Sequence, residues 1–390
     1  MSIEIREITD EQRDSILDLS EGHFVDLKAK EIRPSKLTQT ISSFANTDGG
    51  ELYIGIFEKD KVAEIREWNG FDNAEAANAH LQVFEALFPL GEDFTYTFLS
   101  NFNSHGLVLY VTINKTKSIV YSSDEIPYIR RGAQKLPVDT AEKLTRLERN
   151  KGITSFENEL ISIDLSEIWN SEIVIRFMLE VIPSSEPDNW LKKQRLIQGD
   201  KVTVTGVLLF SDLPQAILPK RSGIKVYRYK TSNAEGTRET LVGNPISIEG
   251  CAYDLIKDAV SKTQELIVNI QVLGTSGLEQ VNYPIETLHE IITNAVLHRD
   301  YSVADDIHIR IFDNRVEIES PGRLPAHITV NNILDERFAR NGNLVRVINK
   351  FPEPPNKDVG EGLNTAFAAM RRLKLKEPQI TERLRRRKPL

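Results

Sequence analysis

The sequence has very little cysteine and no long apolar run. Its one cysteine, Cys251, excludes an internal disulfide and a zinc cluster built from several cysteines. No run of about 18 apolar residues is present, so we expect neither a membrane-spanning helix nor a membrane partner. The first residues, MSIEIREITDEQRD, are charged throughout and lack the apolar core of a signal peptide. These absences favour a cytoplasmic protein.

Several motifs of well-known enzyme classes are also missing. The chain has no GxxxxGK[ST] phosphate-binding loop, and none of its 7 histidines belongs to an HExxH zinc motif. No internal repeat or low-complexity segment is evident. The remaining composition is ordinary: 40% hydrophobic and 27% charged residues in 390 predict a globular protein of two or three domains.

Charge is distributed unevenly along the chain. The formal net charge of -8 argues against uniform binding of nucleic acid over the whole surface. Residues 371–390, however, hold 9 Lys or Arg residues and only 2 acids. A basic end on an acidic body predicts a local phosphate-binding patch, and the alternative is a solvated tail.

The first 150 residues alternate between helical and strand-like patterns. Apolar spacing, turn residues and alternation are the signals for these elements. We expect helices at 9–20, 34–46, 74–87 and 140–149, and strands at 24–28, 51–57, 94–99, 107–113 and 128–132.

Three sequence pieces in this region resemble the Schlafen-type AlbA domain. They are Glu21 followed by Asp26-Leu27-Lys28, the stretch SSFANTDGGELYIGI at 42–56, and YIRRGAQKLPV at 128–138. In the second piece, a helix end and a Gly-Gly turn lead directly into a strand, where glycine supplies positive φ. The resemblance covers about the first 150 residues and implies that this region acts on nucleic acid.

The same resemblance implies a metal site. Metal-dependent ribonucleases of this type use two acids five residues apart and a third after the next strand. Glu21 and Asp26 have that spacing, Lys28 follows them, and Phe57 stands where the third acid is expected, with Glu58 directly after it. Clustered carboxylates bind Mg²⁺ or Mn²⁺, which activates water. We therefore expect Glu21, Asp26 and Glu58 to be metal ligands and, with Lys28, catalytic residues. The alternative is that these acids are solvated surface residues.

The stretch LHEIITNAVLHRDYS at 288–302 carries a polar stripe. Glu290, Asn294 and His298 are four residues apart in an otherwise apolar run, so they project from one face of a helix. A polar stripe on a buried helix is costly unless it is paired or holds a ligand. The alternative is a helix with one solvated edge.

This stretch resembles the N box of the GHKL ATPases, in a divergent RecG-like form. The downstream motifs follow in the family's order: a hairpin pattern at 307–319, Ser320-Pro321-Gly322, an Arg-Asn pair, and DVGEGLN at 358–364. The resemblance implies that Glu290 is a general base and that Asn294 holds the Mg²⁺ of ATP. It implies that the remaining nucleotide-binding residues are His298, Ser320, Gly322, Arg340, Asn341, Gly360 and Gly362.

These patterns predict an α+β protein of three regions. Residues 1–150 form a Schlafen-type AlbA domain, 151–280 an α/β connector, and 281–390 a GHKL-type, Bergerat-like α/β sandwich with a basic end. In the connector, the apolar pattern predicts a buried strand or helix at 206–210, a strand at 225–229 and a helix at 253–268. Many relatives continue into a winged helix, and this chain ends at Leu390.

The expected function is that of an ATP-binding protein that acts on nucleic acid. We predict a metal-dependent, Schlafen-like ribonuclease controlled by nucleotide, plausible in phage defence by analogy, with ATP and Mg²⁺ or Mn²⁺ as cofactors. RNA is the favoured partner over DNA, and a homo-oligomer is expected. The alternative is a non-catalytic, ATP-responsive transcriptional regulator that binds DNA.

Overall fold

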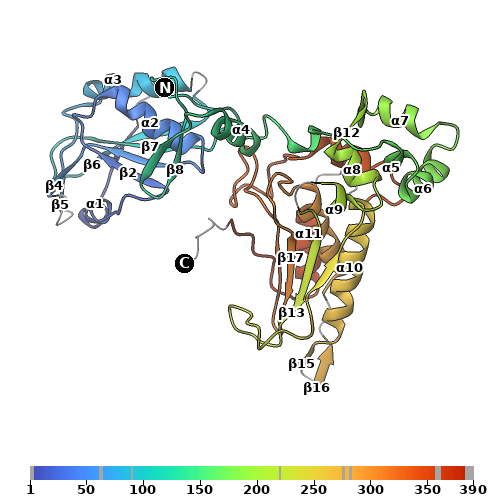
Figure 1. The fold of residues 1–390 in the computed structure, drawn as a ribbon. Coiled ribbons are helices and arrows are strands. Elements are labelled where there is room, and N and C mark those ends of the chain that lie inside the picture. The colour runs from blue at the N-terminus through green and yellow to red at the C-terminus, as the bar shows by residue number, and fades with distance from the viewer. Residues whose placement is uncertain are drawn as a thin grey trace. The chain divides into compact units, whose positions relative to one another are not determined.

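The computed structural model describes residues 4–60, 65–88, 91–218, 221–274, 277–280, 283–355 and 362–382. They divide into two compact units. The N-terminal unit comprises residues up to Thr154 together with Leu324–Thr329, and the C-terminal unit comprises Ser155–Arg323 and the residues from Val330 onward. Each unit combines helices with sheets, which confirms the predicted α+β class (Figure 1).

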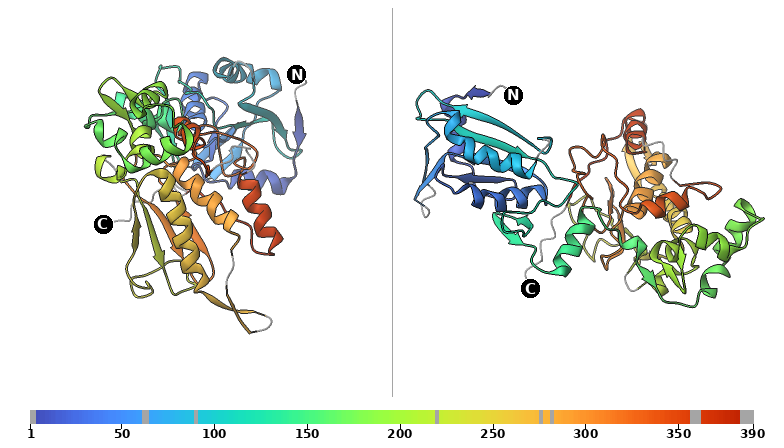
Figure 2. Two further views of the ribbon diagram at one scale, coloured as in Figure 1. Left: turned by 90° about the vertical axis from the view of Figure 1, so that its right-hand side faces the viewer. Right: turned by 90° about the horizontal axis from the view of Figure 1, so that it is seen from above.

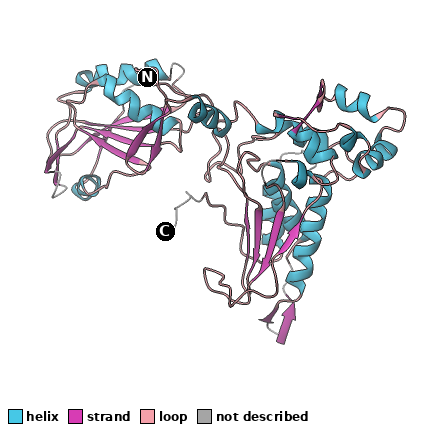
Figure 3. Cartoon of the chain, in the orientation of Figure 1, coloured by secondary structure: helices cyan, strands magenta, loops and turns pink. Residues whose placement is uncertain are grey.

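The N-terminal unit is built on a five-stranded sheet in the order β1-β6-β7-β3-β2. Figure 3 draws its strands in magenta. The two outer pairs, β1 with β6 and β2 with β3, are parallel, and the inner pairs are antiparallel. The strands of this unit are β1 (Ile5–Glu7), β2 (Val25–Lys28), β3 (Gly50–Ile54), β4 (Ile56–Asp60), β5 (Ile65–Trp68), β6 (Phe94–Ser100), β7 (Val108–Ile113), β8 (Tyr128–Arg131) and β9 (Gln134–Pro137). Its helices are α1 (Asp10–Leu17), α2 (Pro34–Ala45), η1 (Ala74–Ala77), α3 (Asn78–Leu87) and α4 (Ala141–Asn150).

Side chains that alternate along the strands of this sheet belong to two apolar clusters, one on each face. Leu52 and Ile54 of β3 join the larger cluster, which α2 and α3 cover with residues such as Phe44 and Phe84. Tyr53, between them, belongs to the smaller cluster on the opposite face. This division follows from the two-residue period of a strand. The sheet is therefore a rigid base for the side chains at the ends of β2.

The C-terminal unit contains a four-stranded sheet in the order β14-β13-β17-β18. Helices α10 and α11 pack against it, and Figure 2 (left) shows α11 between α10 and α13. The strands and helices of this layer are β13 (Ile224–Arg228), β14 (Ile246–Ile248), α10 (Ala252–Val268), α11 (Ile285–Leu297), β17 (Ile307–Ile311), β18 (Val316–Glu319), α12 (Gly342–Ile348) and α13 (Gly362–Arg372). A separate ribbon is formed by β15 (Gln271–Gly274) and β16 (Gly277–Gln280).

A mainly helical segment precedes this layer and shares its core. The rings of Phe177 and Phe210 contact that of Phe351, with ring centroids 4.8 and 5.8 Å from it, so early and late residues of the unit pack together. The elements of the segment are η2 (Phe156–Asn158), β10 (Leu160–Ile161), α5 (Ser166–Trp169), α6 (Glu172–Val181), α7 (Pro187–Lys193), β11 (Ile197–Gln198), β12 (Lys201–Thr203), α8 (Val204–Phe210) and α9 (Pro214–Ile217). The predicted connector thus supplies β13, β14 and α10 to the same layer as the last 110 or so residues.

Most predicted elements are present, with two differences and one open assignment that the structure decides. The expected strand 51–57 is divided at Gly55, whose φ of 118° turns the chain from β3 into β4. The stretch 206–210, left open between strand and helix, lies in helix α8. Helix α11 ends at Leu297, so His298 is its C-terminal cap. Among the described helices, none is both long and apolar enough to cross a membrane.

Candidate nucleic-acid and nucleotide sites

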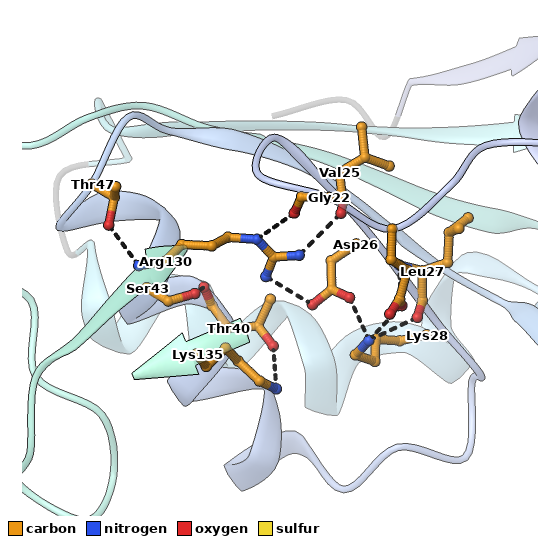
Figure 4. Close-up of polar contacts among 11 residues, drawn as sticks. Gly22, Val25, Asp26, Leu27, Lys28, Thr40, Ser43, Thr47, Arg130 and Lys135 are labelled. Atoms are coloured by element: carbon orange, nitrogen blue, oxygen red, sulfur yellow. Dashed lines mark hydrogen bonds and ion pairs between the residues drawn. The ribbon is translucent and has the colours of Figure 1, made fainter. Parts of the chain in front are cut away.

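The first candidate site surrounds Asp26 on strand β2 (Figure 4). This carboxylate is only 3% exposed, and it is held by two cations. Lys28 Nζ lies 2.5 Å from Asp26 Oδ1, and Arg130 Nη1 lies 3.3 Å from Oδ2. Burial raises the pKa of Asp26, but a hydrogen bond with Glu21 and the charges of Lys28 and Arg130 together hold that pKa below its ordinary value. The carboxylate is therefore ionised at neutral pH.

Arg130 fixes the loop that leads into β2. Its Nε donates to the Gly22 carbonyl at 2.8 Å, and its Nη2 donates to the Val25 carbonyl at 3.0 Å. The guanidinium also lies 4.3 Å from the centre of the buried Phe44 ring. Because a planar guanidinium presents several donors at once, one side chain clamps the loop and neutralises Asp26.

Glu21 shares the same lysine. Its Oε1 lies 2.9 Å from Lys28 Nζ and also accepts a hydrogen bond from the Leu27 backbone N–H at 3.1 Å. Two of the three predicted metal ligands, Glu21 and Asp26, therefore converge on one point. The ammonium of Lys28 lies there, where the prediction had expected a metal ion.

Glu58 does not complete the predicted set of three. It is exposed on β4, where it pairs with Arg66 of β5 in a separate two-stranded sheet. The turn at Gly55 is the physical reason, because the chain leaves the five-stranded sheet before it reaches Glu58. Within the described ranges, no three His, Cys, Asp or Glu side chains are grouped so that they could hold a metal ion. The structure does not bring the three carboxylates together, and their metal-binding role stays a prediction.

Further cations lie near this cluster. Lys135 Nζ donates to Thr40 Oγ1 at 3.1 Å, and burial lowers the pKa of this lysine. Arg131 is exposed at the end of β8, whereas Lys30 Nζ donates to the Gly70 carbonyl at 2.9 Å. The cluster of Lys28, Arg130 and Lys135 thus outnumbers the two carboxylates it surrounds. An excess of cations favours phosphate groups as ligands.

The second candidate site lies on helix α11. Asn294 Nδ2 donates to Glu290 Oε1 at 2.7 Å, one helical turn away. Gly362, the first residue of α13, is so close that an added Cβ would lie 1.9 Å from the same oxygen. The opposite face of α11 is buried through Leu288, Ile292 and other apolar residues. Three predicted residues from two helices therefore meet at one position.

Other predicted residues lie at the C-terminal end of α11, where their polar atoms form hydrogen bonds with backbone carbonyls. Asn341 Nδ2 donates to the carbonyls of Leu297 and Arg299, both at 2.9 Å. Ser320 Oγ donates to the Ala295 carbonyl at 2.8 Å. These side chains thus fix the end of the helix.

Gly322 and Arg340 both contact Asp300. Gly322 has a φ of 119°, and an added Cβ would lie 2.6 Å from Asp300 Cβ. Arg340 Nη1 lies 3.5 Å from Asp300 Oδ2. Burial and the charge of Arg340 lower the pKa of His298 to about 4, so this imidazole is neutral at pH 7. Gly360 lies outside the described residues.

Sequence reasoning missed two residues of this region. Asp300 is 7% exposed and accepts hydrogen bonds from the backbone N–H and the hydroxyl of Ser302 at 2.9 and 2.6 Å. Arg299 is 1% exposed and donates to the carbonyls of Arg221 and Asp305. The available signal was the run His298-Arg299-Asp300-Tyr301, which puts charged residues directly after a buried helix.

Two family models match the chain. Residues 21–139 match the family described as "Schlafen, AlbA_2", and residues 304–386 match the family described as "Putative ATP-dependent DNA helicase recG C-terminal". The chain therefore carries a Schlafen AlbA_2 domain followed by a RecG-like, ATPase-type domain, as predicted. These two domains indicate an ATP-binding protein with a function related to nucleic acid.

The chain is also similar to solved structures at low sequence identity. A crystal structure of the DIP2311 protein from Corynebacterium diphtheriae is 20% identical to this chain, with a TM-score of 0.44. The match covers 95% of this chain and 77% of that chain. No curated protein matches.

Proposed function

We propose that this protein binds magnesium-ATP through its C-terminal unit and nucleic acid through its N-terminal unit. The observation that carries the nucleotide part is the meeting of Glu290, Asn294 and Gly362. A glycine that opens a helix lets phosphate oxygens approach backbone N–H groups at its positive end. In this proposal Glu290 accepts a proton from the attacking water.

The donor set fits Mg²⁺ beside the phosphates. The Asn294 amide nitrogen donates to Glu290, so its oxygen Oδ1 is the atom that remains for a cation. Amide and carboxylate oxygens are the ligands that Mg²⁺ prefers, alongside water and phosphate. When bound, Mg²⁺ would neutralise phosphate charge.

Calorimetry with magnesium-ATP tests this assignment. Asn294→Ala should abolish binding, because it removes both the cation ligand and the partner of Glu290. Asn269→Ala is the matched control, since this amide donates to the Glu265 carbonyl at the end of α10. Unchanged ATP affinity in Asn294→Ala would refute the magnesium role.

The nucleic-acid part rests on the cations that surround Asp26 and Glu21. Fluorescence anisotropy with labelled RNA and DNA of equal length tests it, and RNA is expected to bind more tightly. Lys28→Ala should weaken binding and flatten its salt dependence by about 0.7 to 0.9 in log–log slope per lost contact. Lys143→Ala, an exposed lysine on α4 that pairs with Asp139, is the control.

Metal-dependent RNA cleavage is a second candidate function. The convergence of Glu21 and Asp26 on one point supports it, and a metal ion bound there would have to replace the Lys28 ammonium. Incubation of RNA with the protein and Mg²⁺ or Mn²⁺ tests this. Glu21→Gln, at a half-exposed side chain, should abolish cleavage without loss of ATP binding. A salt-sensitive mobility shift without cleavage products would show that the protein binds nucleic acid but does not cut it. A preference for DNA would favour the alternative function, a non-catalytic transcriptional regulator.

Nucleotide control, a homo-oligomeric state and a role in phage defence complete the proposal. A ligand can shift a conformation only through different affinities for its two states. RNA affinity should therefore differ between ATP-bound and ATP-free protein. Sedimentation measures the oligomeric state, and plaque counts on cells with wild type or Glu21→Gln test the defence role.

A further inference from the structure

Phe24 is an aromatic side chain that the fold leaves exposed beside the Asp26 cluster. It is 55% exposed, whereas the phenylalanines Phe44, Phe84 and Phe98 of the same unit are fully buried. Phe24 lies two residues before Asp26, so their Cα atoms are at most about 7 Å apart. A single exposed apolar residue is common, and its significance here depends on how it is held.

The loop that presents Phe24 is fixed on both sides. Gly22 N donates to the Val25 carbonyl at 3.0 Å, and Arg130 bonds the carbonyls of these same two residues. The Phe24 carbonyl itself accepts a hydrogen bond from the Glu51 N–H at 2.7 Å. The backbone around the ring is therefore tied to β3 and to β8.

The ring is also supported from the side. His23 contacts it edge to face, with ring centroids 4.8 Å apart and planes at 87°. His23 Nε2 in turn lies 2.5 Å from Asp48 Oδ2, so the supporting imidazole has a fixed partner. An aromatic ring held in place loses little conformational entropy when a flat ligand stacks on it.

We infer that Phe24 is a stacking platform for an unpaired base, which makes single-stranded nucleic acid the ligand of the N-terminal unit. Single-strand sites combine cations that contact the backbone with aromatic rings on which bases stack. Lys28 and the exposed Arg131 supply the cations here. In a duplex the bases stack on one another and do not reach the ring. The inference rests on the proposed binding of nucleic acid.

Anisotropy with four labelled probes tests the platform. The probes are short oligouridine, oligothymidine of equal length, an abasic strand with the same number of phosphates, and a duplex. Phe24→Ala should weaken the binding of the base-bearing single strands by about 5- to 150-fold, the factor that corresponds to loss of one stacked base. Binding of the abasic strand and of the duplex should not change. Oligouridine and oligothymidine distinguish RNA from DNA as the source of the base.

Two further variants distinguish stacking of a base on the ring from a non-specific apolar contact. Phe24→Trp should keep the affinity, whereas Phe24→Leu should behave like Phe24→Ala. Phe102→Ala is the matched control, because this phenylalanine is 91% exposed but lies between Asn101 and Asn103, which both bond Asp10. Its removal should leave every probe unaffected. Thermal unfolding should be the same for all variants, since neither ring is buried.

The outcomes distinguish this inference from the proposed function. If wild type binds none of the probes, the proposed binding of nucleic acid fails. If wild type binds oligouridine and Phe24→Ala binds it equally well, only the platform is overturned. An equal loss of the abasic and base-bearing strands in Phe24→Ala would also overturn stacking, because it would point to the backbone contacts.

Discussion

A single methyl group added at Gly362 should displace the carboxylate of Glu290. In Gly362→Ala the new Cβ would lie 1.9 Å from Glu290 Oε1 and 2.5 Å from its Cδ. Non-bonded heavy atoms separate to about 3.5 Å, so the carboxylate must move by about 1.5 Å. The backbone of α13 should tolerate the change, since alanine favours a helix over glycine by about 1 kcal/mol.

The expected result is a loss of ATP hydrolysis with little loss of stability, and a smaller loss of ATP binding because the added methyl group also narrows the approach of phosphate to Gly362. A misplacement of about 1 Å at a reacting group costs on the order of 100-fold in rate. Phosphate release and calorimetry measure the two quantities. Gly342→Ala at the start of α12 is the control, because a Cβ there meets no atom within 4 Å.

A double variant tests the mechanism itself. If the methyl group acts through the carboxylate of Glu290, Gly362→Ala should cause no further loss of hydrolysis rate in a Glu290→Ala background. Hydrolysis at the wild-type rate in Gly362→Ala would refute the reasoning. A wild-type protein that binds ATP without hydrolysing it would refute the general-base role of Glu290.

Three further perturbations are informative. Burial lowers the pKa of Lys151 to about 7, below its value in the unfolded chain. The unfolded state then binds more protons between about pH 7 and 10, so stability should rise with pH by up to about 1.4 kcal/mol per unit. Urea unfolding should detect this rise in wild type and a flat profile in Lys151→Met, and equal profiles would contradict it. Arg130→Met should destabilise the N-terminal unit by about 3–5 kcal/mol in denaturant titrations, because it unclamps the loop and removes a buried charge from Asp26; a loss below about 1 kcal/mol would contradict the clamp. Truncation after Pro378 should weaken RNA binding and its salt dependence together if the basic end contacts phosphates; no change in either would indicate a solvated tail.

Local patterns predicted the elements more successfully than the site. Alternation predicted the hairpin that became β17 and β18, and the four-residue spacing of the polar residues predicted α11. The break at Gly55 was not predicted, because the stretch 51–57 is apolar on both sides of a residue whose φ only the fold reveals. That one turn separates Glu58 from the two acids with which it had been grouped.

The sequence by itself determined the order of helices and strands, the two domain types and the spacing of Glu290 and Asn294. These depend on side-chain periodicity and short motifs, which act within a few residues. Only the tertiary structure placed Arg130 on Asp26, Gly362 against Glu290 and Asn341 on the end of α11. Each of these contacts joins residues that are distant in the chain, and their pairing depends on how whole elements pack. No local propensity encodes it.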